Sequence, residues 1–156
     1  MKRFLIALLC VILLFSLCAC AQKEQSSYDY SCTLTIECKE ILTHYEKLNK
    51  DKTSLVPSDG IILDEIICGF NEGESVYDVL RRVCNERKLH LDASITPAYN
   101  TAYVKGINNL YEFDCGELSG WIYSVNGVMP QFGCSDYKLA QGDNIVFSYI
   151  CEYAEF

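Results

Sequence analysis

The sequence predicts an α+β fold of the β-grasp kind, in which one main helix packs on one face of a mixed sheet. Apolar and polar residues alternate in several short segments, as in half-buried strands, and one longer segment carries apolar residues at helical spacing. The predicted order is strand, strand, helix, strand, strand, strand. This order matches an arrangement whose first and last strands are adjacent and parallel at the centre of the sheet. Another α+β sandwich built from the same elements is the alternative.

The first predicted strand covers residues 32–38, where apolar and polar side chains alternate strictly. Cys32, Leu34, Ile36 and Cys38 share its inner face. The two cysteines stand at opposite ends of that face, about 20 Å apart, so they cannot bond to each other. Each needs a partner elsewhere in the chain.

The main helix is predicted over residues 75–88, with Ser75 or Glu74 as its N-cap. Its apolar residues follow the i, i+3, i+4, i+7 spacing and line one side. They are Val76, Val79, Leu80, Val83 and Cys84. We expect this side to cover the sheet, which would bring Cys84 near an inner-face cysteine of the first strand.

The segments on either side of the helix carry weaker patterns. Residues 39–52 predict a short helix or another structured excursion, and residues 61–70 predict a second strand. An irregular connection is expected over residues 89–100. A third strand follows over residues 101–110, interrupted at Gly106.

The C-terminal part of the chain predicts a strand, a tight turn and a last strand. Residues 121–125 alternate and lead into Asn126-Gly127, the dipeptide best suited to the positive φ angles of a hairpin turn. Residues 144–150 alternate again and place their large apolar side chains on one face. These side chains are Ile145, Phe147 and Tyr149.

The N-terminus has the features of an export signal. Basic residues are followed by an apolar run that ends at Leu17 and is too short for a transmembrane helix. Residues 17–20, LCAC, resemble the lipobox of bacterial lipoproteins, which implies that Cys20 becomes the lipidated N-terminus. Ordinary cleavage near Ala19 or Ala21, followed by free secretion, is the alternative.

This signal suggests how the chain is divided. We expect a lipoprotein signal peptide at residues 1–19, a polar tether at residues 20–31 and one domain at residues 32–153. A lipid anchor would hold the domain on the extracytoplasmic face of the cell membrane.

The charge of the mature chain excludes nucleic acid as an expected partner. Removing residues 1–19 takes two of the 13 basic residues and none of the 21 acidic ones, so the net charge becomes −10. A phosphate backbone would be repelled, because nucleic-acid binding needs a cluster of Lys and Arg.

The cysteines that follow Cys20 are expected to form disulfides, as in other small exported domains. The candidates are Cys32, Cys38, Cys84, Cys115, Cys134 and Cys151. Their number after Cys20 is seven, so at least one thiol stays free or pairs with another molecule. We favour a bond between Cys115 and Cys134, which would stabilise the domain by about 3 kcal/mol. Because the sequence has no C-x-x-C pair, no metal site is predicted.

The sequence assembles no obvious catalytic group. Nucleophilic catalysis would need a serine or thiol beside a histidine base, and only His44 and His90 occur, both in polar surroundings. We therefore expect a binding protein and not an enzyme.

Four pieces of the sequence together resemble one protein family. They are GESVYDVL at 73–80, YVKGI at 103–107, SGWIYSVNG at 119–127 and YKLAQGD at 137–143. They look like the bacterial domain of unknown function DUF4430, which is similar to the C-terminal domain of transcobalamin and intrinsic factor. The resemblance implies an exported, surface-anchored module. In the animal proteins the corresponding domain lies over bound cobalamin.

This resemblance and the aromatic residues around the hairpin predict a small-molecule site. The ligand would be a corrinoid such as cobalamin or another small molecule, with no resident cofactor. The predicted ligand-binding residues are Trp121, Tyr123, Asn126, Gly127, Pro130, Gln131, Phe132 and Tyr137. The alternative is a cell-surface protein-interaction or structural module, which would use the aromatic face or an exposed strand edge.

Overall fold

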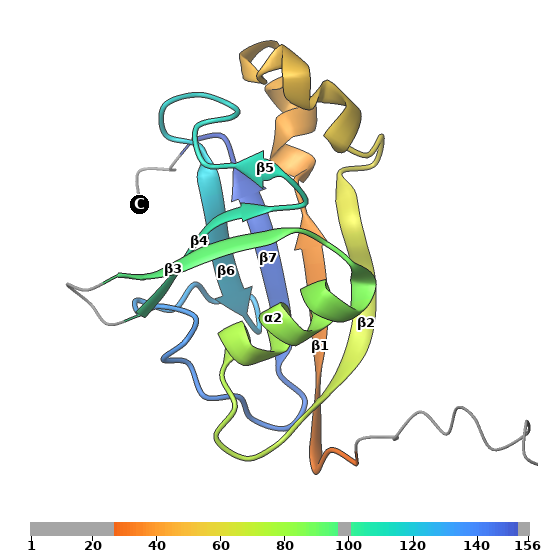
Figure 1. The fold of residues 1–156 in the computed structure, drawn as a ribbon, viewed down its shortest axis with the longest axis vertical. Helices are drawn as coiled ribbons and strands as arrows, with labels where there is room; N and C mark the ends of the chain where they lie inside the picture. Colours follow the sequence, from red (N-terminus) through yellow and green to blue (C-terminus); the bar gives the residue numbers. More distant parts are fainter. Residues whose placement is uncertain (1–26, 97–100, 153–156) are drawn as a thin grey trace, which may run out of the picture.

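The computed structural model describes residues 27–96 and 101–152, which form a mixed α+β fold (Figure 1). The main sheet has four strands in the order β2-β1-β7-β6. Their bounds are Tyr30–Glu37 for β1, Ile61–Phe70 for β2, Gly120–Val125 for β6 and Asn144–Ile150 for β7. β1 and β7 run parallel at the centre, and β2 and β6 pair antiparallel with them at the two edges. The predicted α+β class and the central pair formed by the first and last strands are confirmed.

A second, smaller sheet was not predicted. It has the order β3-β4-β5, with bounds Leu91–Thr96, Thr101–Ile107 and Leu110–Tyr111. The expected irregular connection at residues 89–100 therefore contains a strand. The third predicted strand, now β4, pairs with β3 and β5 instead of joining the main sheet. The hydrogen bonds from β4 hold β3 extended; its sequence, LDASIT, alternates apolar and polar residues, but Asp92 and Ala93 are residue types with low strand propensity.

The main helix, α2, spans Val76–Arg87 and begins with a capping box. The Ser75 Oγ accepts a 3.2 Å hydrogen bond from the backbone N–H of Asp78, and the Ser75 N–H donates to the Asp78 carboxylate at 2.9 Å. These two bonds satisfy amides that would otherwise have no partner at a helix N-terminus. Ser75 is thus the N-cap, one of the two predicted residues.

The larger hydrophobic core lies between the main sheet on one side and α2 with the small sheet on the other. Figure 1 shows α2 and the small sheet crossing the same face of the main sheet. The buried stripe of α2, which includes Leu80 and Val83, packs in one cluster with Leu34 of β1 and Phe147 of β7. The predicted helix face and the inner face of the last strand are therefore both buried as expected.

A second cluster closes the end of the sheet where β1 and β7 finish. Residues 39–55 form three short 3₁₀ helices there, η2 Lys39–Thr43, η3 Tyr45–Lys47 and η4 Lys50–Leu55, in place of one short helix. Ile41 and Leu48 pack from this segment onto Tyr149. The segment is a structured excursion that covers the second cluster.

The cysteines occupy both clusters, and their positions change one prediction. The Sγ atom of Cys115 lies 2.8 Å from the Sγ atom of Cys151 in the second cluster. Cys134 belongs to the larger core, where its thiol points to the carbonyl of Ala102 at 3.8 Å. This corrects the predicted pairing of Cys115 with Cys134. Sequence order alone did not show that the two residues lie in different clusters.

The predicted lipobox and Cys20 lie outside the described residues. Within residues 27–96 and 101–152, no helix has the length and apolar character needed to cross a membrane.

Candidate ligand-binding groove

A groove of about 200 Å³ opens between β4, β6 and the loop that follows the hairpin turn. Its walls come from Ala102, Tyr103, Val104, Trp121, Ile122, Tyr123, Met129, Pro130, Gly133, Cys134 and Phe147. None of these described lining residues carries a charged side chain. The groove therefore favours an uncharged, apolar or aromatic group over an ion.

Tyr123 joins two walls of the groove. Its hydroxyl donates a 2.7 Å hydrogen bond to the carbonyl oxygen of Phe132 in the loop. Its ring stacks on Phe147 of β7, with 5.9 Å between the ring centres. Burial raises the pKa of the Tyr123 hydroxyl above its usual value, so the group stays a neutral donor near neutral pH.

Trp121 is held just as firmly on the same strand. Its indole Nε1–H donates to the carbonyl oxygen of Leu110 at 2.9 Å. Its ring meets Tyr149 edge to face, with the ring centres 5.3 Å apart. Because the polar end of the indole is already bonded, the part that faces the groove is apolar.

Exposed apolar side chains surround the opening of the groove. Tyr103 is 48% exposed and Met129 is 41% exposed, although both line the groove. Phe132 is 52% exposed, and its ring stacks on Tyr137. Tyr103 and Met129 therefore give a ligand or a partner an apolar contact surface at the groove, and Phe132 adds an exposed ring in the adjacent loop.

The groove includes only some of the predicted ligand-binding residues. Trp121, Tyr123 and Pro130 line it, and Phe132 contributes the carbonyl that accepts from Tyr123. Gln131 is exposed and lies outside the lining.

The other predicted residues maintain the local structure. Asn126 and Gly127 adopt φ angles of 54° and 77° in the hairpin turn. The Asn126 side chain also donates to Asp143 Oδ1 and accepts from the Asn144 amide, both at 2.9 Å. Tyr137 supports the loop by stacking on Phe132 and by accepting from the α2 amide of Val76 through its carbonyl oxygen.

Sequence reasoning missed the wall that β4 supplies. Ala102, Tyr103 and Val104 belong to the small sheet, and that sheet reaches β6 only in the folded structure. Phe147 was predicted on the buried face of the last strand, but nothing in its spacing showed that it would also face a groove. Met129 lies two residues after the hairpin turn, and this proximity was the one available signal for it.

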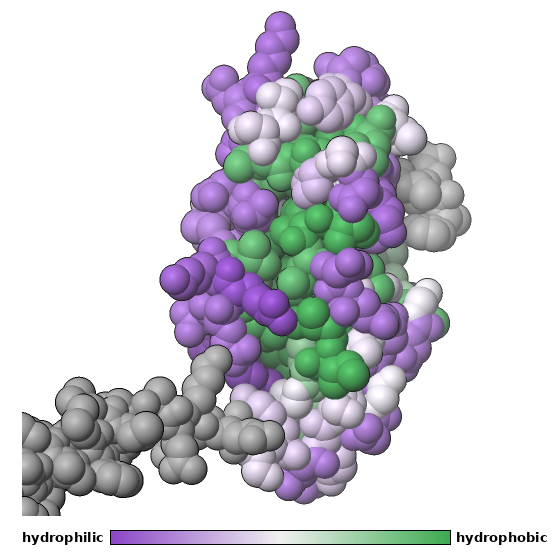
Figure 2. All heavy atoms as spheres, turned by 90° about the vertical axis from the view of Figure 1, so that its right-hand side faces the viewer, coloured by the Kyte–Doolittle hydropathy of each residue, from purple (hydrophilic) through white to green (hydrophobic). Residues whose placement is uncertain are grey.

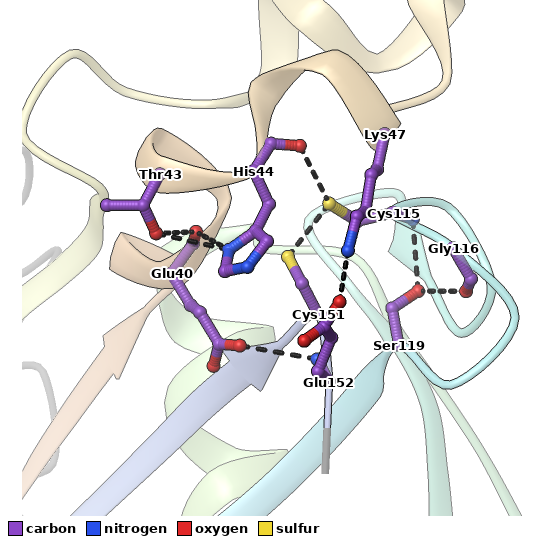
Figure 3. A network of polar contacts seen from close by, with 9 residues as sticks. All are labelled: Glu40, Thr43, His44, Lys47, Cys115, Gly116, Ser119, Cys151 and Glu152. Carbon is purple, nitrogen blue, oxygen red and sulfur yellow. Dashed lines mark hydrogen bonds and ion pairs between the residues drawn. The ribbon is translucent and has the colours of Figure 1, made fainter. Parts of the chain in front are cut away.

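One cluster of potential metal ligands lies at the opposite end of the sheet. Among the described residues, ligand atoms of Glu40, His44 and Cys151 come within 4.8 Å of one another. Figure 3 shows the His44 ring and the Cys151 sulfur close together, beside Cys115. The arrangement could hold a metal only if the Cys151 sulfur were available as a thiolate.

A family model supports the assignment of the fold. The model of DUF4430, a domain of unknown function, matches residues 73–150, which is half of the 156-residue chain. The chain belongs to the DUF4430 family. The matched part contains every residue that lines the groove. Among curated proteins, none matches the chain.

Two solved structures are similar to this DUF4430 protein at low sequence identity. Haptocorrin in complex with Cbi has a TM-score of 0.53 and 9% identity, and the match covers 86% of this chain and 29% of haptocorrin. A protein from Ruminococcus gnavus, for which metal binding is suggested, has a TM-score of 0.47 and 13% identity. That match covers 80% of this chain and all of the other. The likeness to haptocorrin shows a shared fold and confirms the predicted resemblance to a transcobalamin-type domain.

Proposed function

We propose that this DUF4430 protein is a lipid-anchored, extracytoplasmic binding module that holds an apolar part of a small molecule in the groove, without turnover. The observation that carries the proposal is the groove itself, an uncharged cavity whose aromatic lining includes Trp121 and Tyr123. Both side chains are oriented by hydrogen bonds through their polar atoms, so their apolar surfaces are ready for a ligand. Preorganised walls of this kind are typical of ligand sites.

The size of the groove limits what it can take. Sites that enclose a drug-sized ligand have volumes of roughly 300–1,000 Å³. The groove, at about 200 Å³, matches one edge or substituent of such a ligand. A corrinoid is the first candidate, because a domain of the same fold occurs in haptocorrin, which was solved with Cbi. The rest of the ligand would contact the exposed rim formed by Tyr103, Met129 and Phe132.

A titration with a matched pair of variants tests this proposal. Met129 lines the groove, whereas the adjacent Val128 is 67% exposed and does not line it. Calorimetry with cobinamide should show binding to the wild type and to Val128→Ala. We expect roughly five-fold weaker binding to Met129→Ala, since about 1 kcal/mol of apolar contact is lost. No heat with cobinamide at millimolar concentration removes the corrinoid from the proposal.

Trp121 provides a second readout for colourless ligands. It is the single tryptophan of the chain and lines the groove, so its fluorescence reports occupancy directly. A ligand that binds without changing this emission, and whose affinity is unchanged in Met129→Ala, binds elsewhere and contradicts the assignment of the site.

The membrane anchor is tested separately in the full chain. Cys20→Ser removes the residue that would carry the lipid, and Cys18→Ser alters a neighbouring cysteine of the same segment. We expect Cys20→Ser to leave the membrane fraction and Cys18→Ser to stay in it, because acyl chains supply the anchoring energy. Equal distribution of both variants would contradict lipid attachment at Cys20.

Protein recognition at β2 is the second candidate function. β2 is an edge strand of the main sheet, and its Ile67 is 81% exposed. Figure 2 shows apolar side chains gathered along the side of the molecule where β2 lies. Edge strands with exposed apolar residues can add a strand from a partner. If this surface binds an envelope protein, chemical crosslinking in cells should trap a complex of the wild type with that protein. Ile67→Lys should abolish this complex and Met129→Ala should preserve it.

A further inference from the structure

Two buried sulfur atoms meet at the end of the main sheet, away from the groove. Cys115 lies in the loop between β5 and β6, and Cys151 directly follows β7. Their Sγ atoms are 2.8 Å apart, and the two residues are 0% and 2% exposed. Figure 3 shows the two side chains pointing toward each other below the backbone of His44. The distance is within about 0.8 Å of a sulfur–sulfur bond, so a small adjustment of the side chains is enough to form one.

The backbone around Cys115 is already held in place for this contact. The amide of Cys115 donates to Ser119 Oγ at 3.0 Å, and Ser119 Oγ donates to the carbonyl of Gly116 at 2.8 Å. Ser119 Oγ also lies 2.9 Å from the hydroxyl of Tyr149, two residues before Cys151. Ser119 therefore links the loop of Cys115 to the strand that leads to Cys151.

A different observation brings a second pair together. Cys32 of β1 and Cys68 of β2 stand directly opposite each other in the antiparallel register. Both are buried, at 1% and 6% exposure, and the Cys32 thiol points to the carbonyl of Cys68 at 3.7 Å. Residues opposite each other on one face have Cβ atoms about 4.5–5.5 Å apart, which is close to disulfide geometry.

We propose that the protein contains two disulfides, Cys115–Cys151 and Cys32–Cys68, and that Cys38, Cys84 and Cys134 remain thiols. Each bond forms when two thiols lose two protons and two electrons. The electrons and protons pass to an acceptor disulfide, of an oxidoreductase or of a small molecule, which becomes a dithiol. The first bond would tie the loop at residues 112–119 to the end of β7. The second would tie the edge strand β2 to the centre of the sheet.

The Cys115–Cys151 bond forms while the chain folds. Burial raises the pKa of both Cys115 and Cys151 in the folded protein, and a buried thiol has little of the thiolate that attacks a disulfide. The same burial then protects the finished bonds from reductants. We expect them to resist reduction until the protein unfolds.

The first disulfide also excludes a metal at the neighbouring ligand cluster. That cluster contains Glu40, His44 and Cys151. Once the Cys151 sulfur is bonded to Cys115 it is no longer a thiolate, which leaves one carboxylate and one imidazole. Two ligands are too few for a structural zinc site.

Peptide mapping of the exported full chain tests the pairing. Trypsin alone leaves Cys115 and Cys134 on one peptide, and Cys32 and Cys38 on another. A second protease that cleaves after glutamate separates the first two residues at Glu117 and the other two at Glu37. Free thiols are first alkylated in denaturant, and a second label is added after reduction. We expect the second label on Cys115, Cys151, Cys32 and Cys68 and linked peptides for the two proposed pairs. A linked peptide that joins Cys115 to Cys134, or the first label on Cys115 and Cys151, overturns the first pair. A linked peptide that joins Cys32 or Cys68 to any other cysteine, or the first label on both, overturns the second pair.

The inference rests on the export that is part of the proposed function, because disulfides persist in oxidising compartments. A second experiment separates the two. The protein is unfolded, reduced and refolded with glutathione disulfide, and then mapped in the same way. If the pairs form in this experiment and not in cells, the geometry is right and export is wrong. If different pairs form, the structural inference itself fails.

Stability measurements check the first bond independently of the mapping. Prior reduction in denaturant should lower the urea midpoint of the wild type by roughly 1 M or more, since a loop of this length is released. Cys84→Ala should keep that shift. Cys115→Ser/Cys151→Ser should lose about half of it, because the Cys32–Cys68 bond closes a loop of the same length and is also reduced. If the mapping finds no peptide linked through Cys115 and Cys151, and the reduced wild type binds one zinc ion per chain, these residues form a metal site and not a disulfide.

Discussion

The hydroxyl of Tyr123 on β6 donates a 2.7 Å hydrogen bond to the carbonyl oxygen of Phe132, and this bond connects two walls of the groove. Tyr123→Phe removes only the hydroxyl and keeps the stacking on Phe147. We expect a loss of about 1 kcal/mol in the free energy of unfolding, measured by urea denaturation. Amides of the loop at residues 129–134 should exchange faster, and groove ligands should bind less tightly.

A distant tyrosine is the control for this change. Tyr45 is 45% exposed, and its hydroxyl makes a long, 3.4 Å contact with the carbonyl of Thr53. Tyr45→Phe should change the stability by less than about 0.5 kcal/mol. Equal effects of the two variants would show that the Tyr123 bond does not hold the loop.

The capping box of α2 predicts a local stability effect. Ser75→Ala removes the oxygen that accepts from the Asp78 amide, and it also removes the 2.6 Å bond that the Ser75 hydroxyl donates to the Asp78 carboxylate. We expect a loss of about 1 kcal/mol, measured by urea denaturation. Ser54→Ala, at an exposed serine, is the matched control and should be nearly neutral. An intact stability in Ser75→Ala would mean that packing alone defines the start of the helix.

Local patterns explain why much of the main sheet could be predicted. β1 and β7 alternate strictly because one face of each is buried, and α2 has both a cap at Ser75 and a continuous apolar stripe. The small sheet could not be predicted in the same way. β3 alternates apolar and polar residues over six positions only, and Asp92 and Ala93 have low strand propensity, so the strand depends on the hydrogen bonds that β4 supplies.

Some residues of the groove could also be predicted from local patterns, whereas others depend on how distant segments pack. Trp121 and Tyr123 were predictable because they are aromatic and lie on a strand next to a turn. Ala102 of β4 was not predictable, since its position in the groove depends on how the small sheet packs against β6. The contact between Cys115 and Cys151 likewise depends on where a loop meets the end of β7, which no local pattern records.

The hairpin turn allows backbone and side-chain effects to be separated at one residue. Asn126 has a φ of 54°, and its side chain bonds to Asp143 and to the amide of Asn144. Asn126→Gly keeps the backbone conformation accessible but loses both side-chain bonds, whereas Asn126→Ala adds the strain of a positive φ. We expect losses of about 1 kcal/mol for glycine and about 2 kcal/mol for alanine by urea denaturation. Alanine no worse than glycine would show that the turn relaxes to another conformation.

Buried thiols predict a loss of stability at alkaline pH. Burial raises the pKa of Cys84 from 9.0 to about 11, because the thiolate is poorly solvated among the core residues. The unfolded chain therefore releases this proton at a lower pH than the folded protein. The contribution of Cys84 to stability is complete below pH 9 and is lost as the pH rises toward 11.

Cys84→Ala isolates this contribution. Between pH 8 and pH 10.5 the wild type should lose about 2 kcal/mol more stability than the variant, because the pKa of Cys84 rises from 9.0 to about 11 on folding. Urea midpoints of both proteins at the two pH values give the difference, and other titrating groups cancel because they are common to both. The result also bears on the disulfides, because only a free thiol can titrate. If both proteins lose the same stability, Cys84 is not a buried thiol and has been consumed in a bond that the proposed pairing does not contain.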